Sequence, residues 1–303
     1  LKSNKAVLCE KPMTMNATQT MILIDASRKN NTPLMEAFMY KSHPQTIKIC
    51  EILKESFKPP LIIDAEFCFQ VEVPESHRLV NRELGGGSIL DIGCYPMSIS
   101  RLAVGKVNGK DFLNPNGIEC ESELNSQGVD LNAQANLTFE DGSTAHIKSA
   151  TNLASESTVT IKDASNTLII NQPWHCGEYT ERASSLELQL GSNEFKTIEI
   201  STEKGIYAIE IEHFEELIEA GDIESKIVPH NDSHGNMIAL DRWRKGSGVY
   251  YESDKGENVA GSLFSFDIKE NRKEIKRANL PGIEKDLSRL VFGCDNQSDS
   301  NHA

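Results

Sequence analysis

The chain has 303 residues, of which 38% are hydrophobic and 25% charged, and its 45 acidic against 31 basic side chains give a net charge of −14. This length allows one large or two ordinary domains with a substantial core. The net negative charge argues against sequence-independent binding to the phosphate backbone of a nucleic acid. No apolar run approaches the roughly 20 residues that cross a bilayer, and the amino terminus lacks the zones of a signal peptide, so no membrane partner is expected.

The first elements form a strand–helix–strand unit. Residues 5–9 are apolar and predict a buried strand, and residues 14–29 carry apolar side chains at helical spacing. Thr32 and Pro33 end this helix, and residues 34–39 predict a second strand. Such a unit belongs to a parallel sheet, but one unit is too little for a whole doubly wound domain.

The middle of the chain predicts helices and a long series of strands. Helical spacing predicts helices over residues 43–56 and 85–105, and later over 207–220 and 232–246. Strands are predicted at residues 61–73, 131–139, 144–150, 157–162, 167–171, 186–190 and 195–201. Because most of these strands follow one another without helices between them, they indicate an antiparallel sheet.

The strand at residues 5–9 ends in the turn Glu10-Lys11-Pro12. A lysine at the carboxyl end of a parallel strand projects into the crevice where such sheets bind ligands. Its ammonium group can hydrogen-bond a substrate hydroxyl, and partial desolvation can bring its pKa into a range useful for catalysis. The alternative is a surface lysine at a strand end, and position alone does not decide between the two.

The second group of candidate residues follows the glycines Gly85–Gly87. If the next residues are helical, Asp91 and Tyr95 share one helix face, and a carboxylate beside a phenol can handle protons. The alternative is an ordinary glycine-rich turn, with Asp91 favoured by the helix dipole and Tyr95 in the core. Gly93 and Pro96 argue against a long regular helix here. The glycines lack the spacing of a phosphate-binding loop.

Other polar residues lie near these two motifs. Four follow or end the second predicted strand: Glu36, Tyr40, Lys41 and His43. Ligand contact is one interpretation, although a histidine before a proline is more often a capping residue. Arg78 and Arg82 precede the glycines and could bind a polar substrate or lie on a solvated surface. Cys94 is interpreted as a core residue, because no histidine lies nearby in sequence.

The cysteines point to an intracellular environment. There are seven, an odd number without closely spaced pairs, which is typical of reduced thiols. The sequence contains neither a C-x-x-C pair nor a His-rich spacing of the zinc type. We therefore expect a cytoplasmic protein without a metal site.

Four segments in register resemble the glucose–fructose oxidoreductase / inositol dehydrogenase / MocA family. They cover roughly residues 1–250 and are Val7–Pro12, Met35–Pro44, Gly85–Tyr95 and Asp232–Met237. The branch that they most resemble contains dihydrodiol and sugar dehydrogenases, in which tyrosine replaces the histidine of inositol dehydrogenases. The resemblance implies an α/β fold: a Rossmann remnant of parallel sheet at residues 1–43, then a substrate and oligomerisation domain at 44–252 with a large, open, mainly antiparallel sheet.

The resemblance also implies a reaction and a site. The reaction would pass hydride between NAD or NADP and a CH–OH group of a sugar, cyclitol or dihydrodiol, with the protein aligning the reactants and moving the proton. The implied catalytic residues are Lys11, Asp91 and Tyr95, with Tyr95 as general acid/base. The implied cofactor contacts are Glu10, Lys11 and Pro12. The implied substrate contacts are Tyr40, His43 and Arg78.

The sequence departs from the family at its start. Family members carry a glycine-rich dinucleotide loop and most of a Rossmann sheet ahead of the Glu-Lys-Pro turn, so we expect a truncated sequence that is inactive alone and does not reveal the choice between NAD and NADP. The open sheet implies a homodimer or higher homo-oligomer. A non-catalytic ligand sensor on the same scaffold is the alternative function, and retention of Lys11 and Tyr95 favours the enzyme.

The carboxyl-terminal part differs in composition. Residues 253–284 are rich in Lys, Glu, Asn and Asp and are interpreted as a linker. Leu280–Ile283 and Leu287–Cys294 resemble the opening strand of an aldo-keto reductase, which implies that residues 285–303 begin a barrel on a second NADPH enzyme. The alternative is a frayed tail.

Overall fold

The computed structural model describes residues 1–179, 182–255, 277–278 and 287–288. Most of the predicted linker and of the segment resembling an aldo-keto reductase therefore lies outside the described residues. Within that part of the chain the structure gives the short helix η2 (Glu252–Asp254) and the paired strands β11 (Arg277–Ala278) and β12 (Leu287–Ser288). These elements leave the prediction of a barrel untested.

The amino-terminal elements form the predicted parallel unit. Strand β1 (Val7–Glu10) pairs in parallel with β2 (Leu34–Ala37), and helix α1 (Ala17–Asn30) connects them. Asn16 caps this helix by accepting a hydrogen bond from the Gln19 backbone N–H at 3.0 Å. The unit places the residues after Glu10 at the carboxyl end of a parallel strand, as the sequence predicts.

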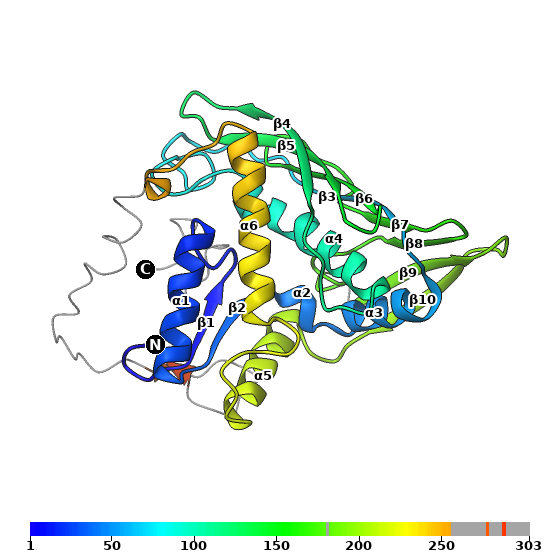
Figure 1. Ribbon diagram of the computed structural model, residues 1–303, viewed down its shortest axis with the longest axis horizontal. Helices are drawn as coiled ribbons and strands as arrows, with labels where there is room; N and C mark the ends of the chain where they lie inside the picture. Colours follow the sequence, from blue (N-terminus) through cyan, green and yellow to red (C-terminus); the bar gives the residue numbers. More distant parts are fainter. Residues whose placement is uncertain (180–181, 256–276, 279–286, 289–303) are drawn as a thin grey trace.

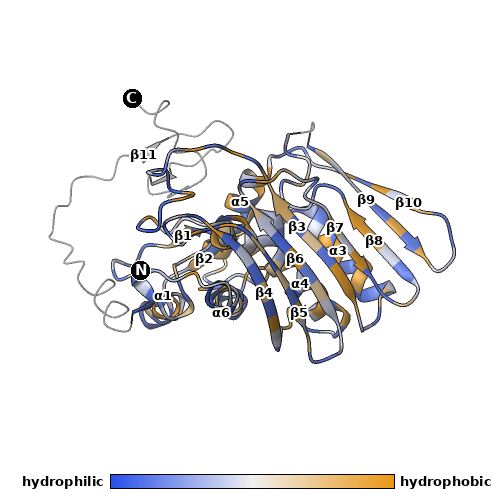
Figure 2. Cartoon of the chain, turned by 90° about the horizontal axis from the view of Figure 1, so that it is seen from above, coloured by the Kyte–Doolittle hydropathy of each residue, from blue (hydrophilic) through white to orange (hydrophobic). Residues whose placement is uncertain are grey.

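The second sheet has eight strands in the order β10-β9-β8-β7-β3-β6-β5-β4. Only the β3–β6 pair is parallel among these neighbours, and the rest are antiparallel. The strands are β3 (Ile62–Cys68), β4 (Gly117–Leu124), β5 (Asp130–Thr138), β6 (Thr144–Ala150), β7 (Val159–Lys162), β8 (Asn166–Ile170), β9 (Ala183–Leu190) and β10 (Lys196–Ser201). Buried and exposed side chains alternate along the central strands, because one face packs on the core and the other meets solvent (Figure 2).

Helices cover the buried face of this sheet. They include α3 (Pro44–Ser56), the π-helical turn η1 (Ile89–Gly93), α4 (Cys94–Val107) and α6 (His230–Gly246). Helix α6 packs on α1, α4 and β4, and it lies between the parallel unit and the large sheet (Figures 1 and 2). The short helix α2 (Met39–Ser42) leads from β2 into α3, and α5 (Ile206–Glu219) packs against α2. Among the described residues, none of the helices could cross a membrane.

The predicted fold class is confirmed: a short parallel unit followed by an α/β region with a large, mainly antiparallel sheet. Two local differences are informative. Strand β4 was not predicted, and helix α3 begins at Pro44 because His43 caps it. Over residues 85–105 the predicted glycine-rich turn is followed by a helix that begins at Ile89. The irregularity that Gly93 indicated is the π-helical turn, after which α4 continues with Pro96 in its first turn.

Candidate active site

Lys11, Asp91 and Tyr95 come together at the carboxyl end of β1. Lys11 is 6% exposed, and its Nζ donates a hydrogen bond to the Asp91 backbone carbonyl at 2.6 Å. The same Nζ lies 3.9 Å from Asp91 Oδ1 and 5.2 Å from the centre of the Tyr95 ring. Residues about eighty positions apart in the chain therefore form one cluster, because η1 and the start of α4 pack against the end of β1.

Asp91 lies between two cations. Besides the Lys11 ammonium group, the Arg78 guanidinium contacts it, with Arg78 Nη1 at 3.0 Å from Asp91 Oδ1. The Asp91 side chain is 13% exposed and that of Arg78 is 30% exposed. This arrangement keeps a carboxylate in a fixed orientation beside a buried lysine, which is suited to binding a polar group.

Tyr95 is buried among aromatic rings. Its ring centre lies 5.1 Å from that of Phe38 and 5.4 Å from that of Phe67, both in edge-to-face geometry. Its hydroxyl group donates to Met39 Sδ at 3.1 Å. Because a thioether sulfur is a weak acceptor, a substrate oxygen could replace Met39 as the partner of this hydroxyl at small cost.

A cavity of about 380 Å³ opens beside Lys11. Its lining comprises residues 10–15 and 84–87, the α1 side chains Gln19 and Leu23, the η1 side chains Leu90 and Asp91, and Arg78 and Leu79. Its volume is in the range of small-molecule sites. Gly86 allows the loop to fold back on itself, because a Cβ there would lie 2.6 Å from the Arg78 carbonyl oxygen. We call this the lysine cavity.

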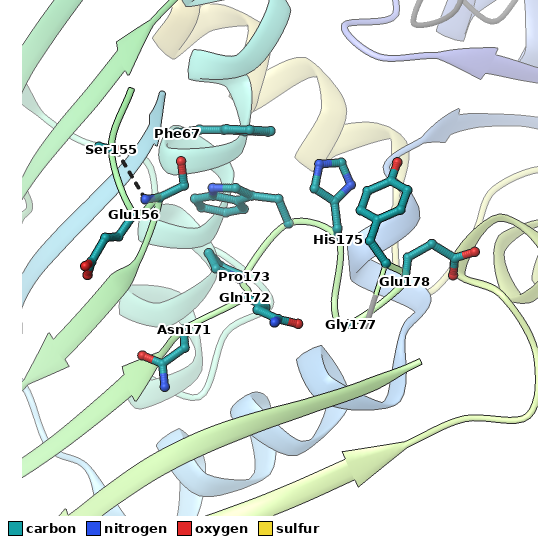
Figure 3. A pocket seen from close by; sticks show the side chains of 12 residues that line it. Phe67, Ser155, Glu156, Asn171, Gln172, Pro173, His175, Gly177 and Glu178 are labelled. Atoms are coloured by element: carbon teal, nitrogen blue, oxygen red, sulfur yellow. Dashed lines mark hydrogen bonds between the residues drawn. The ribbon is translucent and has the colours of Figure 1, made fainter. Parts of the chain in front are cut away.

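A second cavity, of about 300 Å³, is lined by Phe67, Trp174, His175 and Tyr179, among other residues (Figure 3). The stacked rings of Phe67 and Trp174, 5.6 Å apart, form one wall of this aromatic cavity. The Trp174 ring lies 5.6 Å from that of Tyr95. Tyr95 lines neither of the two cavities, and its buried ring lies near both Lys11 and the aromatic wall.

The predicted substrate residues take different positions. Arg78 lines the lysine cavity. The Tyr40 hydroxyl hydrogen-bonds Ser98 Oγ at 2.8 Å, and burial raises the pKa of Tyr40 well above its ordinary value. His43 accepts a hydrogen bond from the Gln45 N–H at 3.1 Å, and burial lowers its pKa. Neither Tyr40 nor His43 lines the lysine cavity or the aromatic cavity, although the Tyr40 ring packs against Trp174 in the wall of the aromatic cavity.

Sequence reasoning did not identify Phe67 and Trp174. Trp174 follows the last residues of β8 in a turn, where no periodic pattern reveals its direction. Its indole N–H donates to the Glu66 carbonyl at 3.0 Å, which fixes the ring across from Phe67. The aromatic wall therefore forms from segments more than one hundred residues apart in sequence, and tertiary packing alone brings them together.

The segment from Asp232 to Met237 is part of the frame of the site. Asp232 forms buried ion pairs with Lys41 and with Arg101, whose Nη1 lies 2.7 Å from Asp232 Oδ1. Burial alone would raise the pKa of Asp232, but Lys41 and Arg101 hold it below its ordinary value. These contacts join α6 to α2 and α4. Among the described residues there is no group of three or more His, Cys, Asp or Glu side chains that could hold a metal ion.

Comparison with known proteins agrees with this geometry. Residues 59–165 match the family model of the GFO/IDH/MocA C-terminal domain. This segment is therefore similar to that domain. The family resemblance predicted from the four segments is thereby confirmed. The matched residues include β3, the Gly85–Gly87 loop, Asp91 and Tyr95, and the central strands of the large sheet.

Two curated relatives show which proteins share this sequence. The D-xylose 1-dehydrogenase (NADP(+)) 2 of Haloferax volcanii is 26% identical over 253 residues, which are 84% of this chain and 72% of that enzyme. The trans-1,2-dihydrobenzene-1,2-diol dehydrogenase of Xenopus tropicalis is 38% identical over 127 residues, which are 39% of this chain and 37% of that enzyme. The similarity to GFO/IDH/MocA proteins thus extends beyond the matched domain.

Solved structures show the same fold. An aldose-aldose oxidoreductase from Caulobacter crescentus, complexed with glycerol, matches with a TM-score of 0.69 at 19% identity, covering 82% of this chain and 71% of that one. A 3-ketoreductase from Actinomadura kijaniata, in complex with NADP and TDP-benzene, matches with a TM-score of 0.69 at 22% identity, covering 82% and 73%. The chain therefore shares its fold with these two oxidoreductases.

Proposed function

We propose that this chain is the catalytic part of an NAD(P)-dependent oxidoreductase that transfers hydride between a nicotinamide cofactor and a CH–OH group of a sugar, cyclitol or dihydrodiol. The observation that carries the proposal is the cluster of Lys11, Asp91 and Tyr95, of which Lys11 and Asp91 line the lysine cavity. The named activities of the relatives support it, since they are sugar and dihydrodiol dehydrogenases.

The residues of the lysine cavity fit the reactive end of a nicotinamide cofactor. Glu10, Lys11 and Pro12 form one wall, and they offer a buried ammonium group and backbone carbonyls to a polar ring carboxamide and ribose. When bound, the nicotinamide ring accepts or supplies the hydride. The name of the Haloferax enzyme and the NADP in the Actinomadura structure favour NADP over NAD.

Each member of the cluster has a distinct role in this proposal. Lys11 donates a hydrogen bond to the reacting substrate oxygen, and its charge stabilises the phenolate formed when Tyr95 gives up its proton. Tyr95 is the general acid/base that exchanges a proton with that oxygen. Asp91, held by Arg78, orients Lys11 and the substrate hydroxyl group.

The aromatic cavity suits the rest of the substrate. The flat Phe67–Trp174 wall can stack on the C–H face of a sugar or on the ring of a dihydrodiol. Polar groups at the opposite side, including Asn171, Gln172 and Glu178, can bind hydroxyl groups. Tyr40 and His43 then support the substrate site from behind, because Tyr40 packs against Trp174 at 6.1 Å between ring centres.

A non-catalytic ligand sensor on this scaffold fits the observations less well. A sensor needs a binding cavity but has no need of a tyrosine hydroxyl beside a buried lysine. The relatives are named as dehydrogenases and reductases, which also favours the enzyme.

We also propose the division of the chain and its assembly. Residues 1–43 would belong to the cofactor-binding domain, and residues 44–252 to the substrate domain. A second copy of the chain would pack on the open face of the large sheet and form a homodimer or a higher homo-oligomer. The supporting observation is that helices cover one face of this sheet while side chains such as Ile62, which is 60% exposed, lie on the other.

Titration of NADPH and NADH by fluorescence tests the cofactor proposal. We expect saturable binding of NADPH, with weaker binding of NADH. Absence of binding of either cofactor would contradict the proposed function.

A further inference from the structure

Asp130 lies beneath the start of the helix that carries Asp91 and Tyr95. It is the first residue of β5 and is fully buried. Its Oδ2 accepts hydrogen bonds from the Ile89 N–H at 2.6 Å and from Ser88 Oγ at 2.9 Å. Ser88 makes no side-chain capping bond itself, so a carboxylate from a distant strand satisfies this helix start and interacts favourably with its dipole.

The glycine loop packs directly on this carboxylate. A Cβ on Gly87 would lie 2.3 Å from Asp130 Oδ1 and 3.1 Å from the Tyr251 hydroxyl oxygen. Gly87 also has a φ of +131°, a conformation that residues with side chains rarely adopt. The backbone of a loop that lines the lysine cavity thus lies in contact with both Asp130 and Tyr251.

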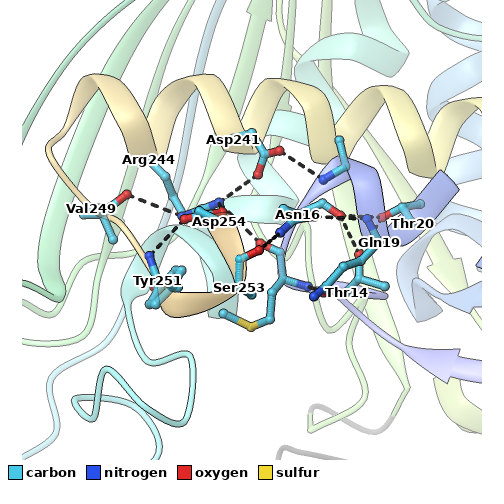
Figure 4. A network of polar contacts seen from close by, with 12 residues as sticks. Thr14, Asn16, Gln19, Thr20, Asp241, Arg244, Val249, Tyr251, Ser253 and Asp254 are labelled. Atoms are coloured by element: carbon cyan, nitrogen blue, oxygen red, sulfur yellow. Dashed lines mark hydrogen bonds and ion pairs between the residues drawn. The ribbon is translucent and has the colours of Figure 1, made fainter. Parts of the chain in front are cut away.

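Tyr251 is itself fixed by a buried ion-pair network (Figure 4). Its hydroxyl group donates to the Gly86 carbonyl, and its backbone N–H donates to Asp254 Oδ2 at 2.9 Å. Arg244 is fully buried, lies 4.8 Å from the centre of the Tyr251 ring and pairs with Asp254 at 2.8 Å. Arg244 Nη2 also donates to the Met15 carbonyl at 3.3 Å, so the network contacts both walls of the lysine cavity.

A carboxylate is a costly choice for helix capping alone at this position. Asp130 Oδ1 is buried and, within the described residues, has no hydrogen-bond partner. Burial raises the pKa of Asp130 to about 6, although Arg244 and the bonds from Ile89 and Ser88 favour the charged form. An Asn or Ser would cap the helix without burying a charge. The carboxylate of Asp130 therefore has a role besides capping the helix, because a neutral side chain could supply the cap alone.

We propose that Asp130 is a positioning residue for the proposed reaction. It holds the glycine loop and the helix start so that Asp91 and Tyr95 lie next to Lys11, while Tyr251, fixed by Arg244 and Asp254, holds the same loop through the Gly86 carbonyl. The kinetic part of this inference rests on the proposed function. Its structural part does not, and the two parts have separate measurements.

The structural measurement is hydrogen exchange of the backbone in residues 86–95, followed by mass spectrometry on the full chain. Asp130→Asn should increase exchange there about tenfold, since the helix start loses its charged acceptor. The matched control is Asp163→Asn in the β7–β8 turn, where the carboxylate also accepts backbone hydrogen bonds, from Lys58, Ser165 and Asn166. It should leave residues 86–95 unchanged. Equal exchange in wild type and Asp130→Asn would overturn the proposal.

The kinetic measurement separates positioning from stability. Asp130→Asn should lower kcat about tenfold with KM within about twofold, because the proton-transfer geometry changes while the binding surfaces stay. Wild-type kcat should fall below about pH 6 as Asp130 is protonated, and the Asn variant should lack this dependence. The charged and titratable groups in this network are Arg244, Tyr251 and Asp254. Neither arginine nor tyrosine titrates in that range, and Arg244 holds the pKa of Asp254 below its ordinary value despite burial.

A second, milder variant keeps the proposal testable if Asp130→Asn fails to fold. Tyr251→Phe removes only the hydroxyl group that holds the Gly86 carbonyl, and it should lower kcat severalfold with the same KM. An unchanged kcat in both variants would overturn the positioning role even if the wild type turns over. If the wild type turns over no substrate but exchange at residues 86–95 responds as expected, the proposed function fails while the positioning of the helix by Asp130 stands.

Discussion

At the scale of single residues, the distinctive feature is the buried Tyr95, which lies near both a cation and an aromatic wall. Its ring neighbours Lys11 and also Phe67 and Trp174. Its hydroxyl group donates a hydrogen bond to the sulfur atom of Met39. A weak acceptor keeps the hydroxyl oriented without occupying it strongly. A substrate oxygen near Lys11 could therefore take over this hydrogen bond.

The first prediction concerns this hydroxyl group. Tyr95→Phe should lower kcat/KM for sugar or dihydrodiol oxidation by roughly 10²–10⁴, because it removes the group that exchanges a proton with the substrate. The aromatic packing is retained, so the melting temperature should change by only about 2 °C. The control is Tyr250→Phe, which is 50% exposed and outside both cavities. Turnover by Tyr95→Phe at the wild-type rate would exclude Tyr95 as the acid/base.

At the scale of elements, helix α5 carries a buried carboxyl group near the end of β1. Glu210 is 4% exposed, and burial, with a further contribution from the charge of Glu10, raises its pKa to about 8 from an ordinary 4.5. The folded protein therefore holds a proton there that the unfolded chain releases near pH 4.5. Between these two values, stability should decrease as the pH rises.

This gives a prediction on stability. Glu210→Gln should raise the melting temperature relative to wild type at about pH 8.5, and the difference should shrink towards about pH 5, where Glu210 is neutral in the folded protein. Thermal unfolding followed by circular dichroism measures it. Glu212→Gln on the same helix, whose exposed carboxylate pairs with Lys204, is the control and should show no such trend. A constant difference across this pH range would contradict a buried, neutral Glu210.

The elements also show what could be predicted from sequence. Strands such as β6 were predicted at the observed residues because buried and polar side chains alternate along them. Strand β4, at the sheet edge, was missed although Ile118, Cys120 and Leu124 alternate with Glu119, Glu121 and Glu123. The Lys11, Asp91 and Tyr95 cluster could be predicted because each residue lies in a short motif. Asp130 and Trp174 could not, because their roles depend on contacts between segments far apart in the chain.

At the scale of the whole molecule, the helices of the described residues cover one face of the large sheet. The other face is mixed: Glu119, Glu121 and His146 lie on it together with Ile62. An antiparallel sheet tolerates solvent on such a face, so the proposed packing of a second copy there requires a direct test.

The corresponding prediction is on assembly. Ile62→Glu places a charge on the open face and should convert a dimer into a monomer in sedimentation velocity experiments, because a buried unpaired charge opposes association. Ile218→Glu, at an exposed position of α5, should leave the dimer intact. A wild-type monomer at micromolar concentrations, or a dimer that persists in Ile62→Glu, would contradict the proposed interface.

The most direct test of the central claim is NADP⁺ reduction by the protein, with D-xylose and trans-dihydrobenzenediol as substrates. The comparison is between wild type, Lys11→Met and the exposed control Lys48→Met, which changes the same residue type on α3. We predict turnover of at least one substrate by wild type and Lys48→Met, and a loss of more than about 100-fold in Lys11→Met with the fold intact. Equal turnover in wild type and Lys11→Met would show that the cluster of Lys11, Asp91 and Tyr95 is not the active site.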